Sequence, residues 1–331
     1  MVPTLREILR TPPHKSPITG PGVWKGSDFS SPADYWYYLS SETLRELDRA
    51  LQRIRAAGTP IFSLTAQDFP LPSFENDAEA LREELRAGSG FVVVKGLPID
   101  RYTEEEACMI YWGLGTHLGR PIPQKVVGGL LYSVRDEGYN LERDYGAAGV
   151  RTSKTTAGFN YHTDSPSMLA GHTPDIVCLL ALQTAKSGGE SAIISANTVH
   201  NVIQEERPEY LDRLYAPYHM DRRAELPPGE PPTLPVPVFA YDGQLAVRYL
   251  RFYVTKGAEV AGVPLSAEDT DALDYLDEVM RRPNLPLTFG MDRGDMQFVN
   301  NVFILHSRAE YQDHPEPERK RHYMRLWLKY R

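Results

Sequence analysis

Two short segments place a histidine and an aspartate two positions apart, a spacing that lets both side chains reach one cation. The first segment is "GFNYHTDSPS", with His162 and Asp164, and the second is "YHMDRR", with His219 and Asp221. In an extended backbone, residues i and i+2 project from the same face. The chain contains nine histidines, so a pair of this kind is also expected by chance. The rest of each site must therefore decide between them.

A third histidine ends an apolar run. In "MQFVNNVFILHSRAEY" the hydrophobic stretch finishes at His306, where an imidazole can point into the mouth of a barrel. Two imidazoles and one carboxylate form the facial triad of non-haem iron oxygenases, which leaves positions open for cosubstrate and oxygen. The same donors suit a zinc hydrolase with an open position, and a capped core histidine is the alternative without a metal. No separate ligand set accompanies His219 and Asp221, which we assign to structure.

Two arginines lie in the last apolar segment, "RHYMRLWLKY". Strand alternation predicts one face that carries both arginines and two aromatic residues: Arg321, Tyr323, Arg325 and Trp327. Arginine suits a buried strand poorly unless it meets an anion, and its planar fork matches a carboxylate in two-point contact. The distal carboxylate of 2-oxoglutarate is such an anion. The alternative is an ion pair with a nearby acidic residue: Glu310, Asp313 or Glu318.

The elements that position these residues change character near residue 125. Before it, three segments read as helices: "SSETLRELDRALQRIRAAG" ending at Gly58, "NDAEALREELRAGSG", and "TEEEACMIYWGLGTHLG" opened by Thr103. "FVVVKGL" between them reads as a buried strand. After it, short apolar segments alternate with Gly, Pro and Asp, as in strands: "VVGGLLYSV", "DIVCLLALQTA", "SAIIS", "LAVRYLRFYV", "MQFVNNVFIL" and "RHYMRLWLKY".

Two further helices are predicted near residues 197–215 and 266–282. This pattern predicts a mainly β protein of the α+β class, an antiparallel sheet or barrel with helices packed outside. We expect one composite domain, in which residues 1–89 form an N-terminal arm and helices, and residues 90–331 form the core.

Composition excludes several classes of partner. The net charge is −8 and the pI about 5.7, which argues against a nucleic-acid partner, since that needs a concentrated basic face. The longest strongly apolar run, "IVCLLAL", is far shorter than a membrane span requires. The two cysteines, Cys108 and Cys178, lie in no paired-ligand spacing, and no signal-peptide pattern opens the chain. We therefore predict a cytoplasmic protein without a membrane or nucleic-acid partner.

Four motifs together resemble the taurine dioxygenase (TauD/TfdA) family of Fe(II)- and 2-oxoglutarate-dependent oxygenases. They are "FNYHTDSP", "SGGESAIIS", "NNVFILHSRAEY" and "ERKRHYMRLWL", in this order from about residue 90 to the C-terminus. Each motif is weak alone, but their order and intervals are specific. The stretches "SPITGPGVWKGSDF" and "DYWYYLSSETLRELDRAL" resemble the N-terminal arm of a subgroup. The resemblance implies a double-stranded β-helix core, of the jelly-roll or cupin-like kind, with an N-terminal helical extension.

The resemblance also implies roles for individual residues. His162, Asp164 and His306 would bind iron. Arg321 would grip the distal carboxylate of 2-oxoglutarate, and Arg325 would lie near cosubstrate or substrate. Ser191 stands where the family usually has threonine, and either hydroxyl can donate a hydrogen bond.

The implied reaction uses Fe(II), 2-oxoglutarate and O2, releases succinate and CO2, and hydroxylates, desaturates or epoxidises an unactivated carbon. Related halogenases replace the carboxylate ligand with a small residue, so Asp164 points to an oxygen-derived outcome. We weigh this against the zinc hydrolase, in which the two arginines lack a purpose, and against a catalytically silent barrel. Family members are often dimers or tetramers, and a homo-oligomer is left open here.

The substrate is expected to be a small molecule, with a carboxylate or comparable acceptor group. The long segment 135–161 could form a lid over it. Four candidate substrate residues lie near the predicted ligands: Asn160, Tyr161, Arg151 and Arg308. Arg308 could meet an anion or pair with Glu310 or Asp313. The proposal requires the imidazoles of residues 162 and 306 to lie within about 6 Å and Arg321 to face away from bulk solvent.

Overall fold

The computed structural model describes residues 12–124, 129–140, 151–168, 172–223, 226 and 229–331. Two antiparallel β-sheets form its centre. The larger sheet has seven strands, in the order β1 (Trp36–Tyr38), β2 (Phe91–Lys95), β14 (Met296–Asn300), β6 (Ile176–Gln183), β17 (His322–Lys329) and β3 (Arg120–Pro121), with β4 (Leu131–Val134) also paired to β17. Among the strands of the described residues, β1 and β2 alone pair in parallel. The smaller sheet has the order β13 (Leu287–Phe289), β8 (Ser191–Ser195), β15 (Ile304–Arg308) and β5 (Phe159–His162).

A hydrophobic cluster joins the inner faces of these sheets. Phe91, Val93 and Tyr323 come from the larger sheet and meet Ile193 and Ile304 from the smaller one. Side chains alternate between the two faces of a strand, so each strand contributes every second residue to this interior. The predicted α+β class with a double-stranded β-helix, or jelly-roll, core is confirmed.

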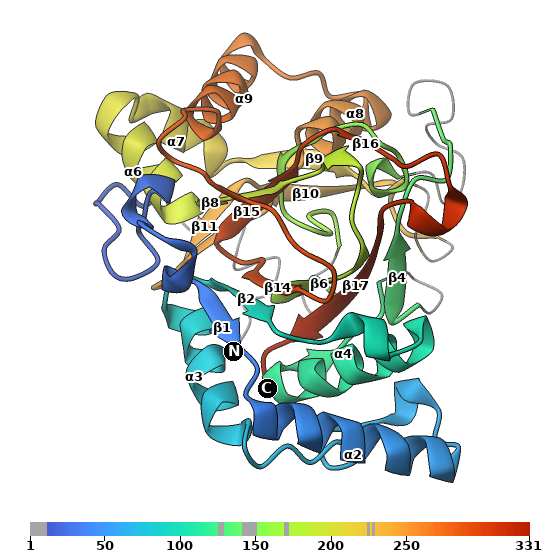
Figure 1. The fold of residues 1–331 in the computed structure, drawn as a ribbon. Coiled ribbons are helices and arrows are strands. Elements are labelled where there is room, and N and C mark those ends of the chain that lie inside the picture. Colours follow the sequence, from blue (N-terminus) through green and yellow to red (C-terminus); the bar gives the residue numbers. More distant parts are fainter. Residues whose placement is uncertain (1–11, 125–128, 141–150, 169–171, 224–225, 227–228) are drawn as a thin grey trace.

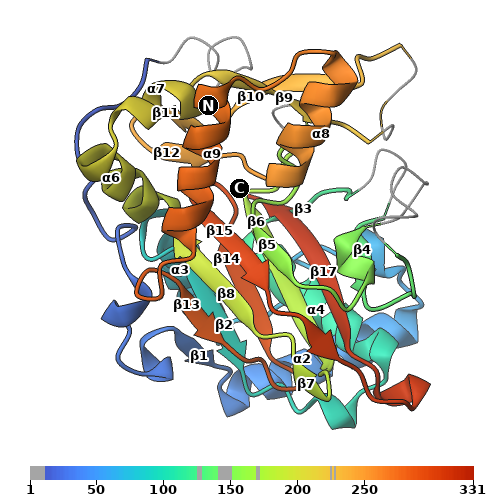
Figure 2. The same cartoon turned by 90° about the horizontal axis from the view of Figure 1, so that it is seen from above.

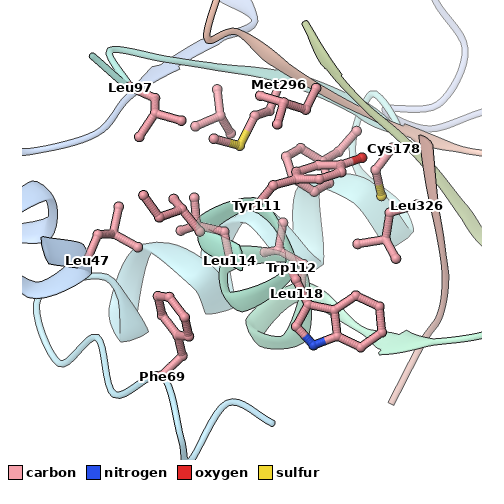
Figure 3. Close-up of a cluster of buried hydrophobic side chains, with 14 of the residues drawn as sticks. Leu47, Phe69, Leu97, Tyr111, Trp112, Leu114, Leu118, Cys178, Met296 and Leu326 are labelled. Atoms are coloured by element: carbon pink, nitrogen blue, oxygen red, sulfur yellow. The ribbon is translucent and has the colours of Figure 1, made fainter. Parts of the chain in front are cut away.

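Three helices cover the outer face of the larger sheet, as Figure 1 shows. They are α2 (Ser41–Ala57), α3 (Glu75–Ala87) and α4 (Glu104–Leu118). Thr103 opens α4 with a capping box, and Gly58 closes α2 with φ of 63° in the left-handed region. Side chains such as Tyr111 and Leu114 of α4 pack against Met296 and Leu326 of the sheet (Figure 3).

A second group of helices lies at the opposite end of the molecule (Figures 1 and 2). It contains α6 (Ala196–Glu206), α7 (Glu209–Leu214), α8 (Arg251–Ala261) and α9 (Ala267–Met280). Two hairpins pack with them, β9 (Pro217–Asp221) with β10 (Thr233–Pro237), and β11 (Phe239–Tyr241) with β12 (Leu245–Val247). We call these four helices, with the two hairpins, the helical lobe. Outside the lobe, the short strand β7 (Ser187–Gly188) pairs with β16 (Tyr311–Gln312).

Short 3-10 helices complete the described elements: Gly26–Asp28, Pro32–Asp34, Ile61–Ser63, Ile99–Arg101, Thr152–Lys154 and Pro317–Arg319. No helix within the described ranges is both long enough and apolar enough to cross a membrane. Residues 36–38 belong to the same sheet as residues 91–95. A division of the chain near residue 90 stays a prediction.

Four predicted elements differ from the observed ones. "LAVRYLRFYV" was predicted as one strand, but β12 ends at Val247 and α8 begins at Arg251, because residues 251–261 pack as a helix on β9. "MQFVNNVFIL" is two strands in different sheets, separated by a turn at residues 301–303. The helix predicted over 197–215 breaks at Pro208 into α6 and α7. In "VVGGLLYSV" the observed strand is Leu131–Val134, and residues 125–128 lie outside the described ranges.

Candidate active site

Three side chains from two distant parts of the sequence converge at the open edge of the smaller sheet. His162 is the last residue of β5 and pairs directly with His306 in the neighbouring strand β15. Directly opposed residues of antiparallel strands share a face, so both imidazoles point the same way. Their ring centroids are 4.3 Å apart, inside the limit set from the sequence. Asp164 follows His162 by two residues and joins them from the adjoining loop.

The donor atoms face one another. Asp164 Oδ1 lies 3.7 Å from His162 Nε2 and 3.8 Å from His306 Nε2. Within the described residues, this is the group of histidine, cysteine and acidic side chains whose ligand atoms are close enough to share an ion, all within 4.8 Å. Two imidazole nitrogens and one carboxylate oxygen match the donor set of a non-haem iron(II) site. His219 and Asp221 form no such group, and His219 Nδ1 instead contacts Thr233 Oγ1 at 2.9 Å.

The protonation states of these groups suit metal binding. Burial and the neighbouring His306 lower the pKa of His162 to about 4, so this imidazole is neutral near pH 7. Its Nδ1 lies 2.8 Å from the Asn160 carbonyl oxygen, which assigns the proton to Nδ1 and leaves the Nε2 lone pair facing Asp164. Burial opposes ionisation of Asp164, yet the Arg325 guanidinium holds the pKa of that carboxyl well below its ordinary value.

The second oxygen of Asp164 is held by strand β17. Trp327 Nε1 donates to Asp164 Oδ2 at 2.8 Å, and Arg325 Nη1 lies 3.1 Å from the same oxygen. Gln124 in turn accepts from Arg325 Nε at 2.8 Å and donates to the Arg325 carbonyl at 2.8 Å. Because Oδ2 is occupied in this way, Asp164 presents Oδ1 alone to the space between the histidines.

Asn301 fixes the backbone of Asp164 to the strand turn that leads to His306. Its Oδ1 accepts from the Asp164 amide at 2.8 Å, and its Nδ2 donates to the Asp164 carbonyl at 3.1 Å and to the Pro174 carbonyl at 3.2 Å. The side chain is buried, with 5% exposure. The side-chain amide of Asn301 therefore fixes the position of Asp164 relative to the turn that leads to His306. Asn301, Trp327 and Gln124 were not predicted as site residues, although the first two stand in the motifs "NNVFILHSRAEY" and "ERKRHYMRLWL".

The predicted alternation along β17 is observed. Arg325 and Trp327 reach Asp164, whereas Leu326 and Leu328 lie in the core under α4. Arg321, just before the strand, is 2% exposed and stacks on Tyr323, with Cζ 3.7 Å from the ring centroid. Its Nη1 is buried without a hydrogen-bond partner. None of the acidic side chains in the described ranges forms an ion pair with it, and Asp313 instead accepts from its backbone amide at 2.7 Å.

A second arginine lies at the same end of the site. Arg308 Cζ is 4.9 Å from the centroid of the Tyr311 ring, and Arg321 Cζ is 5.1 Å from it. Burial, and next the charge of Arg321, lower the pKa of Arg308 to about 10. Its Nη2 donates to the carbonyls of Thr155 and Ala157, and it has no carboxylate within ion-pair distance among the described residues. Two enclosed guanidinium groups without an anion indicate a site for one.

The remaining predicted residues are dispersed around this centre. Ser191 is paired in register with Arg308 and is mostly buried. Asn160 is exposed and contributes its carbonyl to His162. Tyr161 is half-buried, and burial raises the pKa of its phenol. Arg151 is half-buried at the start of a 3-10 helix. Residues 141–150 of the predicted lid lie outside the described ranges.

Comparisons with known proteins agree with this geometry. Residues 35–327 match the family described as taurine catabolism dioxygenase TauD, TfdA family. The chain is 33% identical over 319 residues to FR-33289 synthase of Streptomyces rubellomurinus, which covers 95% of this chain and 91% of that protein. It is 28% identical over 311 residues to the taurine hydroxylase-like protein SAT17 of Stachybotrys chartarum. This match covers 92% of this chain and 77% of that protein.

Solved structures share the fold. An asparagine oxygenase in complex with Fe(II), 2S,3S-3-hydroxyasparagine and succinate superposes with a TM-score of 0.69 at 16% identity, covering 89% of this chain and 93% of that chain. The non-haem iron oxygenase OrfP in complex with Fe, succinate and (3S)-hydroxy-L-Arg gives a TM-score of 0.64 at 16% identity, covering 89% and 94%. At this identity the superposition shows that the fold is shared, and it does not assign the reactions of these proteins to this chain.

Proposed function

This chain belongs to the TauD/TfdA family of Fe(II)- and 2-oxoglutarate-dependent oxygenases, and from that premise we propose that it hydroxylates an unactivated carbon of a small molecule. Desaturation and epoxidation start from the same site and are the alternative outcomes. One oxygen atom of O2 would enter the substrate and the other the succinate formed from 2-oxoglutarate, with release of CO2. The zinc hydrolase is not favoured, because it gives Arg308 and Arg321 no role.

The observation that carries the proposal is the three-donor face of His162, Asp164 and His306. Since Trp327 and Arg325 occupy Oδ2 of Asp164, the protein would supply one oxygen and two nitrogens to an iron(II) ion. Such a face leaves room for a keto acid held through two atoms and for oxygen. When bound, iron and 2-oxoglutarate supply the oxidising chemistry, and the protein orients the reactants and excludes water.

We assign the distal carboxylate of 2-oxoglutarate to Arg321. This guanidinium is enclosed, is held against Tyr323 and has a buried Nη1 without a partner, so a carboxylate would satisfy it. Arg308 was predicted as a substrate residue, but it lies beside the Tyr311 ring together with Arg321. We therefore propose that Arg308 also helps to bind the distal carboxylate of 2-oxoglutarate. Ser191, opposite Arg308, would donate its hydroxyl to the same end.

The structural relatives are named for oxygenation of asparagine or for complexes with hydroxylated arginine, and we propose a small molecule here as well. Asn160, Tyr161 and Arg151 stay the candidate substrate residues. A cytoplasmic location stays a prediction.

The experiment uses the full chain with Fe(II) and 2-oxoglutarate under anaerobic conditions. A chelated keto acid gives iron(II) a weak visible charge-transfer band, and admission of air should then release succinate. Arg321→Gln should raise the apparent dissociation constant for 2-oxoglutarate about 10- to 100-fold, because charged hydrogen bonds are lost. Arg319→Gln, which alters an exposed arginine paired with Glu316, is the control. Absence of both band and succinate, or zinc-supported hydrolysis without oxygen, would refute the proposal.

A further inference from the structure

A third enclosed arginine, Arg248, is hydrogen-bonded to the turn that follows Asp164. Arg248 lies between β12 and α8, in a segment that was predicted to be a strand. Its Nη1 donates to the Met168 carbonyl at 3.1 Å. Among the described residues it forms no ion pair. An arginine enclosed by protein without a carboxylate is costly unless a ligand supplies the anion.

The backbone shows which way this side chain points. The Thr163 amide donates to the Tyr249 carbonyl at 2.8 Å, and the Tyr249 amide donates to the Thr163 hydroxyl at 3.1 Å. Residues 163 and 249 therefore lie side by side. The Tyr249 side chain enters the helical lobe, where its hydroxyl donates to Asp277 at 2.7 Å. Neighbouring side chains in extended backbone alternate, so Arg248 points away from the lobe.

That direction leads to the metal ligands. Arg248 reaches the carbonyl of Met168, which lies four residues after Asp164 in the turn that leaves the site. The Met168 side chain packs in the cluster that contains Trp327, and Trp327 holds Asp164. Arg248 is partly accessible although protein surrounds it, and this enclosure lowers its pKa to about 10. It thus stays charged at neutral pH.

A balance of charges within the described residues leaves this guanidinium without a counterion. Iron(II) and the dianion of 2-oxoglutarate would cancel, as do Asp164 and Arg325, so Arg308, Arg321 and Arg248 together leave an excess of positive charge that an anionic substrate would reduce. Arg308 and Arg321 both lie at the end that we assign to the distal carboxylate of that cosubstrate. Arg248 approaches from a different element, and the single hydrogen bond to Met168 uses few of its N–H donors. A structural anchor for the 165–168 turn needs only one donor and no charge.

We propose that Arg248 binds an oxyanion group of the primary substrate and so selects small molecules that carry a terminal carboxylate, phosphonate or sulfonate. This inference rests on the proposed function, since it assumes that cosubstrate occupies the Arg321 end. The planar fork of arginine suits two-point contact with any of these groups. The anion would hold the rest of the molecule in front of the three-donor face.

The test uses the full chain loaded anaerobically with Fe(II) and saturating 2-oxoglutarate, so that the Arg321 end is filled. The probes are propanoate, propylphosphonate and propanesulfonate, with propanamide as the neutral match, and binding is followed by changes in the visible band. We expect at least one oxyanion to bind about tenfold or more tightly than propanamide. The three oxyanion probes then show which acid group fits best.

Variants separate the inference from the proposed function. Arg248→Gln should weaken binding of the preferred oxyanion about 10- to 100-fold, and Arg248→Lys should lie between it and the wild type. Arg251→Gln is the matched control, because Arg251 already pairs with Asp274 at 2.6 Å and Asp277 at 3.2 Å. A wild-type protein without the visible band sinks the proposed function. The role of Arg248 is overturned if the wild type shows the band but binds the oxyanions no more tightly than propanamide. It is also overturned if Arg248→Gln binds the preferred oxyanion as tightly as the wild type, or if Arg248→Gln loses the band itself.

Discussion

The indole of Trp327 offers the sharpest test of how the metal centre is held. It is 2% exposed and donates to Asp164 Oδ2 at 2.8 Å. Trp327→Phe removes this donor and leaves Arg325 as the remaining partner of that oxygen. Loss of a group that orients a metal ligand typically weakens metal binding about 10- to 100-fold. Because Arg325 stays in place, we expect the lower end, about tenfold, which corresponds to about 1.4 kcal/mol.

The assay is calorimetric titration of the full chain with Mn(II), a redox-stable substitute for Fe(II). Trp112→Phe is a matched control, since Trp112 is also 2% exposed and donates through Nε1 to the Leu64 carbonyl at 3.0 Å, away from the site. Both variants lose a buried hydrogen bond and some packing, so each should lower the free energy of unfolding by about 1–3 kcal/mol. Only Trp327→Phe should weaken Mn(II) binding.

Two results would refute the reasoning. If Trp327→Phe binds Mn(II) as tightly as the wild type, the indole does not position the carboxylate in the metal-bound state. If Trp112→Phe weakens Mn(II) binding to the same extent, the effect reflects general loss of stability. Urea denaturation of both variants measures that stability independently.

Two further predictions follow from other buried groups. Asn301→Ala removes three hydrogen bonds around Asp164 and should lower the free energy of unfolding by about 2–4 kcal/mol while weakening Mn(II) binding; a variant with wild-type unfolding in urea would contradict this. Burial, and next the charge of His14, lower the pKa of His200 to about 4, whereas the pKa of an unfolded histidine is about 6.5. Between these values the unfolded state binds more protons, so the free energy of unfolding should fall by about 3 kcal/mol as pH drops through this window. His200→Leu should flatten that decline, and an unchanged slope in urea titrations at several pH values would count against it.

Several features could be predicted because they depend on neighbours along the chain. The i, i+2 relation in extended backbone puts His162 and Asp164 on one side. The same alternation separates Arg325 and Trp327 from Leu326 and Leu328. The motif at Thr103 opens a helix through bonds that span only three residues. These relations follow from backbone geometry and need no knowledge of the fold.

Other features depend on partners that are distant in sequence. "LAVRYLRFYV" has strand-forming residues throughout, yet residues 251–254 are helical because they begin α8, which packs on β9 within the helical lobe. Gln124 is separated from Arg325 by 201 positions, and Asn301 from Asp164 by 137. No local pattern marks either residue as part of the site.

Residue spacing along the chain was enough to predict the candidate metal ligands, the alternation of the last strand and the class of the fold. The packing of distant segments was needed to show that Trp327 and Arg325 hold one oxygen of Asp164, that Arg308 lies with Arg321, and that Arg248 is bonded to the turn after Asp164. The physical reason is range: alternation and capping act over a few covalently linked residues, whereas the partner of a buried charge is set by how separate segments pack.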